Sequence, residues 1–147
     1  MRIDALPDVV LGKTRDEGPG SPVEFSTAEG GEPLRCCLRD ATPGEDIMLF
    51  GYAPELPPSP YREIGPVFAH AEPCDTTPDE GAYPADWLGR PQVLRAYDRD
   101  GRIHPATRVH DGTDPMAAIT DVLADPDVVQ IHSRNVAYGC YMFAVRR

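Results

Sequence analysis

The chain has 147 residues and a formal net charge of −10 at pH 7, and its apolar fraction of 41% is ordinary for a globular protein. This composition argues against a disordered chain, and no run of about 18 apolar residues is present to form a transmembrane helix. The negative charge argues against nucleic acid or an anionic membrane as partner, because both bind basic clusters, whereas a small anionic molecule could still bind in a local pocket.

The N-terminal half is predicted to contain short strands separated by loops. Residues 12–22, rich in glycine, proline and charge, predict a loop. Strands are predicted at 23–28, 46–52 and 66–71. Both faces of 46–52 are apolar, which favours a central strand covered on both sides. The prolines between 54 and 60 predict an extended loop, and 72–90 is a long acidic segment with one helical turn near Trp87.

The C-terminal half carries the clearest signals. Strands at 92–97 and 102–110 flank a turn at 98–101, which indicates a hairpin. Asp114 and Pro115 suit the cap and first position of a helix. Two last strands are predicted at 128–132 and 140–145. The expected fold class is α+β, a single domain over residues 1–147 with a mainly antiparallel sheet of five to seven strands, one principal helix near 115–124 and long proline-rich loops.

The first candidate site combines cysteines with a histidine. The N-terminus lacks the apolar stretch of a secretory signal, so a cytoplasmic location and reduced thiols are expected. A His and a Cys four residues apart after a strand can reach one metal ion, and structural zinc needs four Cys or His ligands. The ligands expected for zinc are Cys37, His70, Cys74 and Cys140. Burial of inert cysteines beside a core histidine is the alternative.

Basic side chains give two further candidates. Arg35 and Arg39 flank the adjacent Cys36 and Cys37, and nearby guanidinium groups favour the nucleophilic thiolate. Because neighbouring residues of an extended chain point in opposite directions, only one of the two thiols is expected to face a site. In the 92–110 hairpin, alternation with Arg95 opposite His104 predicts one basic face. Its members are Arg95, Arg102, His104, Arg108 and His110. This face is expected either to bind a carboxylate or phosphate or to be a solvated edge.

Several segments resemble one protein family. They are residues 34–40 (LRCCLRD), 60–70 (PYREIGPVFAH) followed by Cys74, 95–98 (RAYD), 101–103 (GRI) and 139–141 (GCY). Together they are similar, over nearly the whole chain, to the small bacterial family called domain of unknown function 1203. The resemblance implies a single-domain cytoplasmic bacterial protein and brings no established reaction. It favours Cys37, Glu63, His70 and Cys74 as site residues.

Two hypotheses use these residues. In the first, the protein is a zinc-binding or thiol-site protein in which Cys37, His70 and Cys74 converge and Cys140 or His132 is the fourth member of the site. In the second, it is a small-molecule enzyme with a Cys–His pair. The roles would be Cys37 as nucleophile or acid, His70 as base, Glu63 as orienting carboxylate and Arg35 or Arg39 as anion clamp.

A third hypothesis is a non-enzymatic interaction module. A partner would bind the proline-rich segment 56–60 as a polyproline helix, although a simple loop is the alternative. The sequence specifies neither a substrate nor an oligomeric state.

Overall fold

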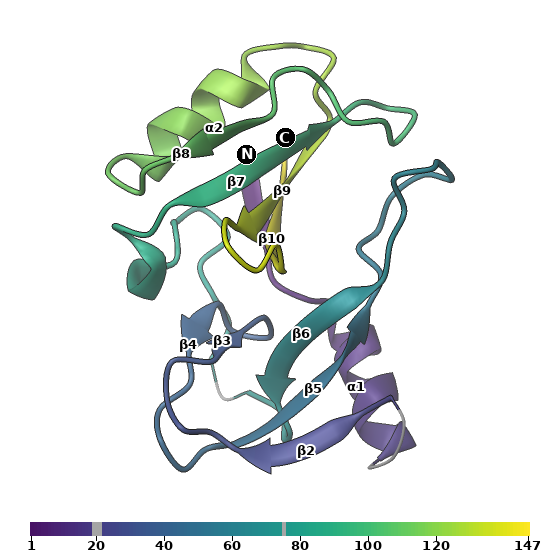
Figure 1. Cartoon of the computed structure of the whole chain (residues 1–147), viewed down its shortest axis with the longest axis vertical. Helices are drawn as coiled ribbons and strands as arrows, with labels where there is room; N and C mark the ends of the chain where they lie inside the picture. The colour runs from purple at the N-terminus through teal and green to yellow at the C-terminus, as the bar shows by residue number, and fades with distance from the viewer. Residues whose placement is uncertain (19–21, 75) are drawn as a thin grey trace.

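A computed structural model describes residues 1–18, 22–74 and 76–147 as two five-stranded sheets, each with an α-helix beside it (Figure 1). The elements in chain order are β1 (Arg2–Asp4), α1 (Asp8–Glu17), β2 (Glu24–Thr27), β3 (Pro33–Leu34), β4 (Arg39–Asp40), β5 (Asp46–Tyr52), β6 (Gly65–His70), the 3-10 helix η1 (Ala85–Trp87), β7 (Gln92–Tyr97), β8 (Arg108–His110), α2 (Pro115–Leu123), β9 (Gln130–Asn135) and β10 (Tyr141–Arg146). The α+β class is confirmed, but the prediction of one sheet is wrong.

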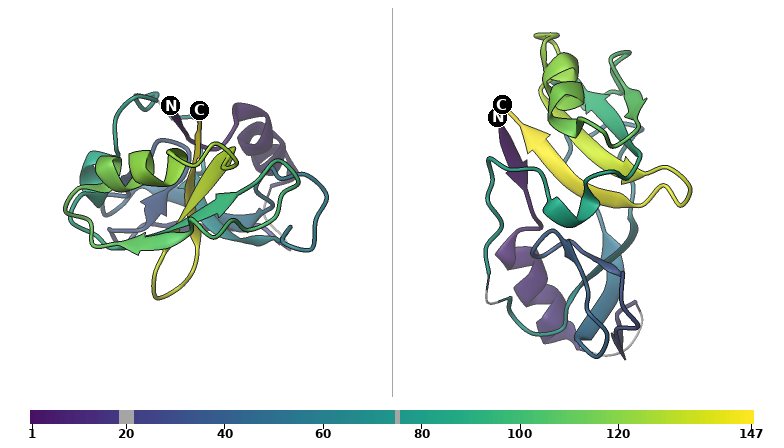
Figure 2. Two further views of the ribbon diagram at one scale, coloured as in Figure 1. Left: turned by 90° about the horizontal axis from the view of Figure 1, so that it is seen from above. Right: turned by 90° about the vertical axis from the view of Figure 1, so that its left-hand side faces the viewer.

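The first sheet is antiparallel, with strand order β1-β10-β9-β7-β8. Its central strands, β9 and β10, consist almost entirely of buried residues. Arg2 pairs with Arg146, so the two ends of the chain lie side by side (Figure 2). The strand predicted at 92–97 is β7, and the strands predicted at 128–132 and 140–145 overlap β9 and β10.

The second sheet has the order β2-β5-β6-β3-β4. The strand predicted at 46–52 is β5, which lies between β2 and β6 as a central strand should. β3 runs parallel to β6, and Leu34 pairs with Phe68. β3 and β4 form a short hairpin on the side of the second sheet that faces the first (Figure 1). This register brings the hairpin turn beside the end of β6.

The two helices had unequal sequence signals. α2 begins as predicted, because Asp114 Oδ1 accepts a hydrogen bond from Ala117 N at 3.1 Å. The loop predicted at 12–22 is wrong for its first part, because α1 extends to Glu17, and residues 19–21 lie outside the described residues. In α1 only Leu11 and Thr14 are buried, so the apolar repeat that predicts a helix is missing. Within the described residues, no helix could cross a membrane.

Two buried clusters join the sheets. One packs on the second sheet and α1 and includes Tyr141 of β10. The other packs beneath α2 and includes Leu38 from the β3–β4 turn. Trp87 is fully buried, lies parallel to Phe143 with 6.1 Å between ring centroids, and donates its Nε1–H to Asp40 at 2.9 Å. Residues of each sheet therefore belong to the core of the other.

Candidate metal centre

The β3–β4 turn positions two thiols. Residues 35–38 form a four-residue loop closed by a hydrogen bond from Leu38 N to Leu34 O at 2.9 Å, and Leu38 has a positive φ of 56°. Because the segment is a turn, adjacent side chains do not alternate as they do in a strand. The Sγ atoms of Cys36 and Cys37 lie 3.8 Å apart. The expectation that only one of them would face a site is therefore wrong.

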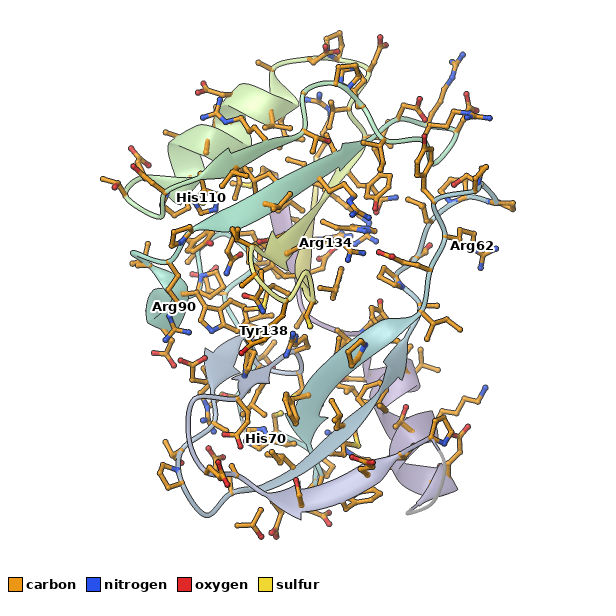
Figure 3. All side chains as sticks on the ribbon, viewed as in Figure 1. Arg62, His70, Arg90, His110, Arg134 and Tyr138 are labelled. Carbon is orange, nitrogen blue, oxygen red and sulfur yellow. The ribbon has the colours of Figure 1, made fainter. Side chains whose placement is uncertain are left out.

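The end of β6 supplies the other two donors. His70 is the last residue of β6, and Cys74 follows four residues later. Figure 3 shows His70 among the strands of the second sheet. Arg15 of α1 donates to the carbonyl oxygens of His70 and Glu72, each at 3.1 Å. The segment that carries Cys74 is thereby fixed against α1.

The four side chains converge. His70 Nδ1 lies 3.4 Å from Cys36 Sγ, 3.8 Å from Cys37 Sγ and 3.0 Å from Cys74 Sγ. All four donor atoms lie within 4.8 Å of one another. Cys36 and Cys37 are buried, whereas His70 and Cys74 are half-buried. These donors could hold a metal ion.

A carboxylate fixes the orientation of the His70 ring. Glu45 Oε2 lies 2.6 Å from His70 Nε2, and Arg39 holds the same carboxylate through two contacts of 2.8 Å. The guanidinium of Arg39, helped by hydrogen bonds from Thr42, lowers the pKa of Glu45 well below its ordinary value. The charged carboxylate can only accept, and it lies nearer to His70 Nε2 than Arg39 Nη2 does at 3.2 Å, so we assign the proton to Nε2. Nδ1 then presents its lone pair to the three sulfurs.

The three thiols differ in acidity. Hydrogen bonds from Cys37, from Cys74 and from the backbone N–H of His70 lower the pKa of Cys36, although burial acts in the opposite direction. Hydrogen bonding to Cys36 raises the pKa of Cys37 and that of Cys74. A bound cation would favour loss of the protons from all three thiols.

A cavity of about 920 Å³ opens beside the cluster. Residues of β1, α1, β5 and β10 and the segment after β6 contribute to its wall. Cys36 and Cys74 belong to this wall, together with Arg15. Among the described residues that line it, neither Cys37 nor His70 is present. The cluster thus has one side open to a cavity and one side covered by protein.

Comparison with known families matches residues 31–147 to the family described as "Protein of unknown function (DUF1203)". The chain belongs to the DUF1203 family. The resemblance found in the sequence is therefore confirmed. No curated protein and no solved structure matches the chain. The range shared with the DUF1203 family includes the four donors and Glu45, whereas Arg15 and α1 precede it.

In this DUF1203 protein, Cys140 lies outside the cluster. It directly precedes β10 in the first sheet, and its Sγ lies 3.9 Å from Tyr138 O. His132 pairs with Ala144 and is buried against the rings of Tyr97 and Tyr141. Of the expected zinc ligands, the structure brings Cys37, His70 and Cys74 together, with Cys36 as the fourth donor.

The residues expected to assist a Cys–His enzyme lie apart from it or have partners. Glu63 precedes β6, at the opposite end of the strand from His70, and pairs with Arg134 and with Arg95. The orienting carboxylate is Glu45. Arg39 is held by Glu45. Arg35 is buried, where it donates to Tyr141 O at 2.7 Å and Pro33 O at 2.6 Å, and burial lowers its pKa to about 10.

The basic face expected on the 92–110 hairpin does not form. β8 covers only residues 108–110, and Tyr97 bridges to Ile103, so the predicted pairing of Arg95 with His104 is wrong. A turn at Pro105 and Ala106 interrupts the second strand. Arg95 contacts Glu63 at 3.3 Å, His104 contacts Asp125 at 3.6 Å, and Arg108 contacts Asp121 at 3.6 Å. Each of these three side chains therefore has a carboxylate of its own as partner, and together they do not form one anion-binding face.

Two residues of the site were missed in the sequence. Cys36 was missed because an extended chain lets only one of two adjacent thiols face a site, whereas a cysteine pair between two very short strands can also occupy a turn. Glu45 carries no sequence signal, because its contact with His70 spans 25 residues. Only the pairing of β5 with β6, which places Ile47 opposite His70, brings Glu45 near the ring.

Proposed function

We propose that this protein binds one Zn²⁺ through Cys36, Cys37, His70 and Cys74, and that the ion joins the β3–β4 turn to the segment after β6. The observation that carries the proposal is the convergence of three sulfurs on His70 Nδ1 while Nε2 is bonded to Glu45. A metal-ligating histidine characteristically donates its other ring N–H to a carboxylate.

The spacing of the donors supports a tetrahedral ion. Zn–S bonds of about 2.3 Å separate two sulfurs in a tetrahedron by about 3.8 Å, and a Zn–N bond of about 2.0 Å gives an N–S separation of about 3.5 Å. Cys36 Sγ and Cys37 Sγ are 3.8 Å apart, and Cys36 Sγ is 3.4 Å from His70 Nδ1. All six separations between the donor atoms are at most 4.8 Å.

The ligand set favours a structural role for the zinc. A site with four protein ligands leaves no position for water, as is typical of Cys₃His structural sites. The turn at 35–38 and the segment at 71–74 have little regular structure of their own, and the ion would cross-link them. Folding and zinc binding are then thermodynamically linked, so the ion stabilises the second sheet.

Elemental analysis tests the proposal directly. Protein loaded with zinc and then desalted is expected to retain about one equivalent, with X-ray absorption showing three sulfurs at about 2.3 Å and one nitrogen at about 2.0 Å. His70→Ala and Cys37→Ser should each lose most of the zinc. Cys140→Ser is the matched control and should retain it. Less than a tenth of an equivalent in the unaltered protein would overturn the proposal.

A thiol enzyme is the second candidate, because Cys36 Sγ lies 3.4 Å from His70 Nδ1 beside a cavity. Alkylation with iodoacetamide separates the two functions. Zinc ligands are protected until a chelator is added, whereas a catalytic thiol reacts at the same rate with and without chelator. The two candidates therefore predict opposite effects of the chelator.

A further inference from the structure

We infer that Cys36 and Cys74 are a peroxide-reactive pair whose oxidation to a disulfide releases the zinc. This inference rests on the proposed function, because it assigns a regulation to the same site. The observation that supports it is that two of the three thiols, Cys36 and Cys74, lie in the wall of the same cavity.

The cavity wall distinguishes the thiols, although Cys36 and Cys37 are equally buried. Cys36 and Cys74 line the cavity of about 920 Å³, and Cys37 is not among the described residues of its wall. Cavities of about 300–1,000 Å³ hold small organic ligands, so hydrogen peroxide or an organic hydroperoxide fits without rearrangement of the backbone. An oxidant that enters by this route therefore meets Cys36 and Cys74 before it meets Cys37.

Chain geometry selects the same pair. A trans peptide fixes the Cα atoms of Cys36 and Cys37 about 3.8 Å apart, which is less than the roughly 4.4 Å at which ordinary disulfides begin. Cys74 belongs to a different segment, and its Sγ lies within 4.8 Å of Cys36 Sγ. A disulfide between Cys36 and Cys74 therefore avoids the strained ring that a disulfide between adjacent residues would close.

The chemistry balances with a peroxide as the only oxidant. The Cys36 thiolate attacks one peroxide oxygen, the O–O bond breaks and hydroxide leaves, which gives a sulfenic acid on Cys36. The Cys74 thiolate then attacks that sulfur, the S–O bond breaks and a second hydroxide leaves. Two protons from solvent convert the hydroxides to water. The two sulfurs lose two electrons, and Zn²⁺ leaves without changing its oxidation state.

Arg15 adds a positive charge to the same wall. Its guanidinium donates to His70 O and Glu72 O, which places it beside the segment that carries Cys74. Arg15 would thus act as a positioning residue for the segment that carries Cys74.

The test treats zinc-loaded full-length protein with hydrogen peroxide and follows released zinc with a chromogenic chelator. One equivalent of zinc should be released as two thiols disappear, and peptide mapping should show a Cys36–Cys74 disulfide. Cys37 and Cys140 should remain open to alkylation by N-ethylmaleimide. Dithiothreitol should restore both thiols and zinc binding.

Metal-free protein separates this inference from the proposed function. If the starting protein holds no zinc, the proposed function fails, but peroxide treatment still tests the pair. Metal-free Cys37→Ser should form the same disulfide, and metal-free Cys74→Ser should form no intramolecular disulfide. A disulfide that includes Cys37, overoxidation without a disulfide, or zinc retained while the thiols stay reduced would each overturn the inference.

Discussion

Glu45 shows how a residue that is not a metal ligand can set the chemistry of one that is. Its carboxylate is held by Arg39 and Thr42 and accepts a hydrogen bond from His70 Nε2 at 2.6 Å. With Nε2 occupied in this way, the ring is held in one tautomer and its free lone pair points at the sulfurs. Glu45 is partly buried and lies 25 residues from His70 in the sequence, so nothing in its local sequence distinguishes it from the other acidic residues.

Glu45→Gln should weaken zinc binding about 10- to 100-fold, because an amide breaks the paired contacts with Arg39 and no longer fixes the ring. Competition with a chromogenic chelator measures the change. Glu63→Gln is the matched control, since Glu63 is also a carboxylate paired with arginines but lies at the other end of β6. Equal zinc affinities for the two variants would show that Glu45 does not support the ligand.

His132 should make the protein sensitive to acid. Burial first, and then the charges of Arg146 and Arg95, lower its pKa to about 3. In the unfolded chain the pKa is about 6.5, so between these values the unfolded state binds one more proton than the folded state. The stability from neutral His132 is therefore present above pH 6.5 and is lost as the pH falls toward 3.

Urea unfolding of metal-free protein at pH 6.5 and pH 4.5 measures this effect without interference from zinc loss. His132 should account for about 2 kcal/mol of the decrease in the free energy of unfolding. His132→Gln should remove that part of the pH dependence, and His104→Gln, a half-buried histidine beside Asp125, should retain it. Identical pH profiles for the protein and for His132→Gln would contradict the assignment.

Elements with strong local signals were predicted from the sequence, and elements that depend on distant contacts were not. β5 and β7 have the predicted bounds, because apolar β-formers lie between prolines and turns. The helix at α2 was predicted from Asp114 as its cap and Pro115 at its first position. The helix α1 was missed because only Leu11 and Thr14 are buried on it, which gives no apolar repeat in the sequence. The strand β8 is shorter than predicted because the chain turns at Pro105. The same holds for the candidate site: three of its four donors were predicted from the sequence, but the turn that brings Cys36 to the site was not.

The segment between β8 and α2 should depend on Gly112. Its φ is +86°, and a Cβ at this position would lie 2.5 Å from backbone atoms of Gly89 and Arg90. Gly112→Ala should therefore destabilise the protein by about 2–4 kcal/mol, from backbone strain and overpacking together. Gly139→Ala is the control: φ there is +73° with no atom within 4 Å of the added Cβ, so about 1 kcal/mol is expected. Thermal unfolding of the two variants separates the effect of overpacking from that of backbone strain. Equal losses of stability would show that the close contacts at Gly112 add nothing to the strain.

At the scale of the whole molecule, the two sheets are held together by a few residues that bond to both. Trp87 stacks on Phe143 of β10 and donates to Asp40 of β4. Arg35 accepts from Leu6 N, donates its own N–H to Phe68 O and reaches Tyr141 O with its side chain. Arg35 directly precedes Cys36 in the β3–β4 turn, and η1, which carries Trp87, lies beside the β3–β4 hairpin (Figure 1). The position of the cluster is therefore set by the association of the sheets.

Arg35→Met tests this coupling, because methionine keeps much of the side-chain volume and removes every donor. The carbonyl oxygens of Tyr141 and Pro33 would lose their partner in a buried region, so the free energy of unfolding should fall by about 2–4 kcal/mol. Arg35→Lys should recover only part of this loss, because one ammonium cannot reproduce the two directed N–H groups with which the guanidinium reaches both carbonyl oxygens. The exposed Arg62→Met is the matched control and should change stability by less than about 0.5 kcal/mol. Urea unfolding followed by the fluorescence of Trp87, the chain's one tryptophan, reports on the contact between the sheets. If Arg35→Met is as stable as the unaltered protein, the buried guanidinium is not what joins them.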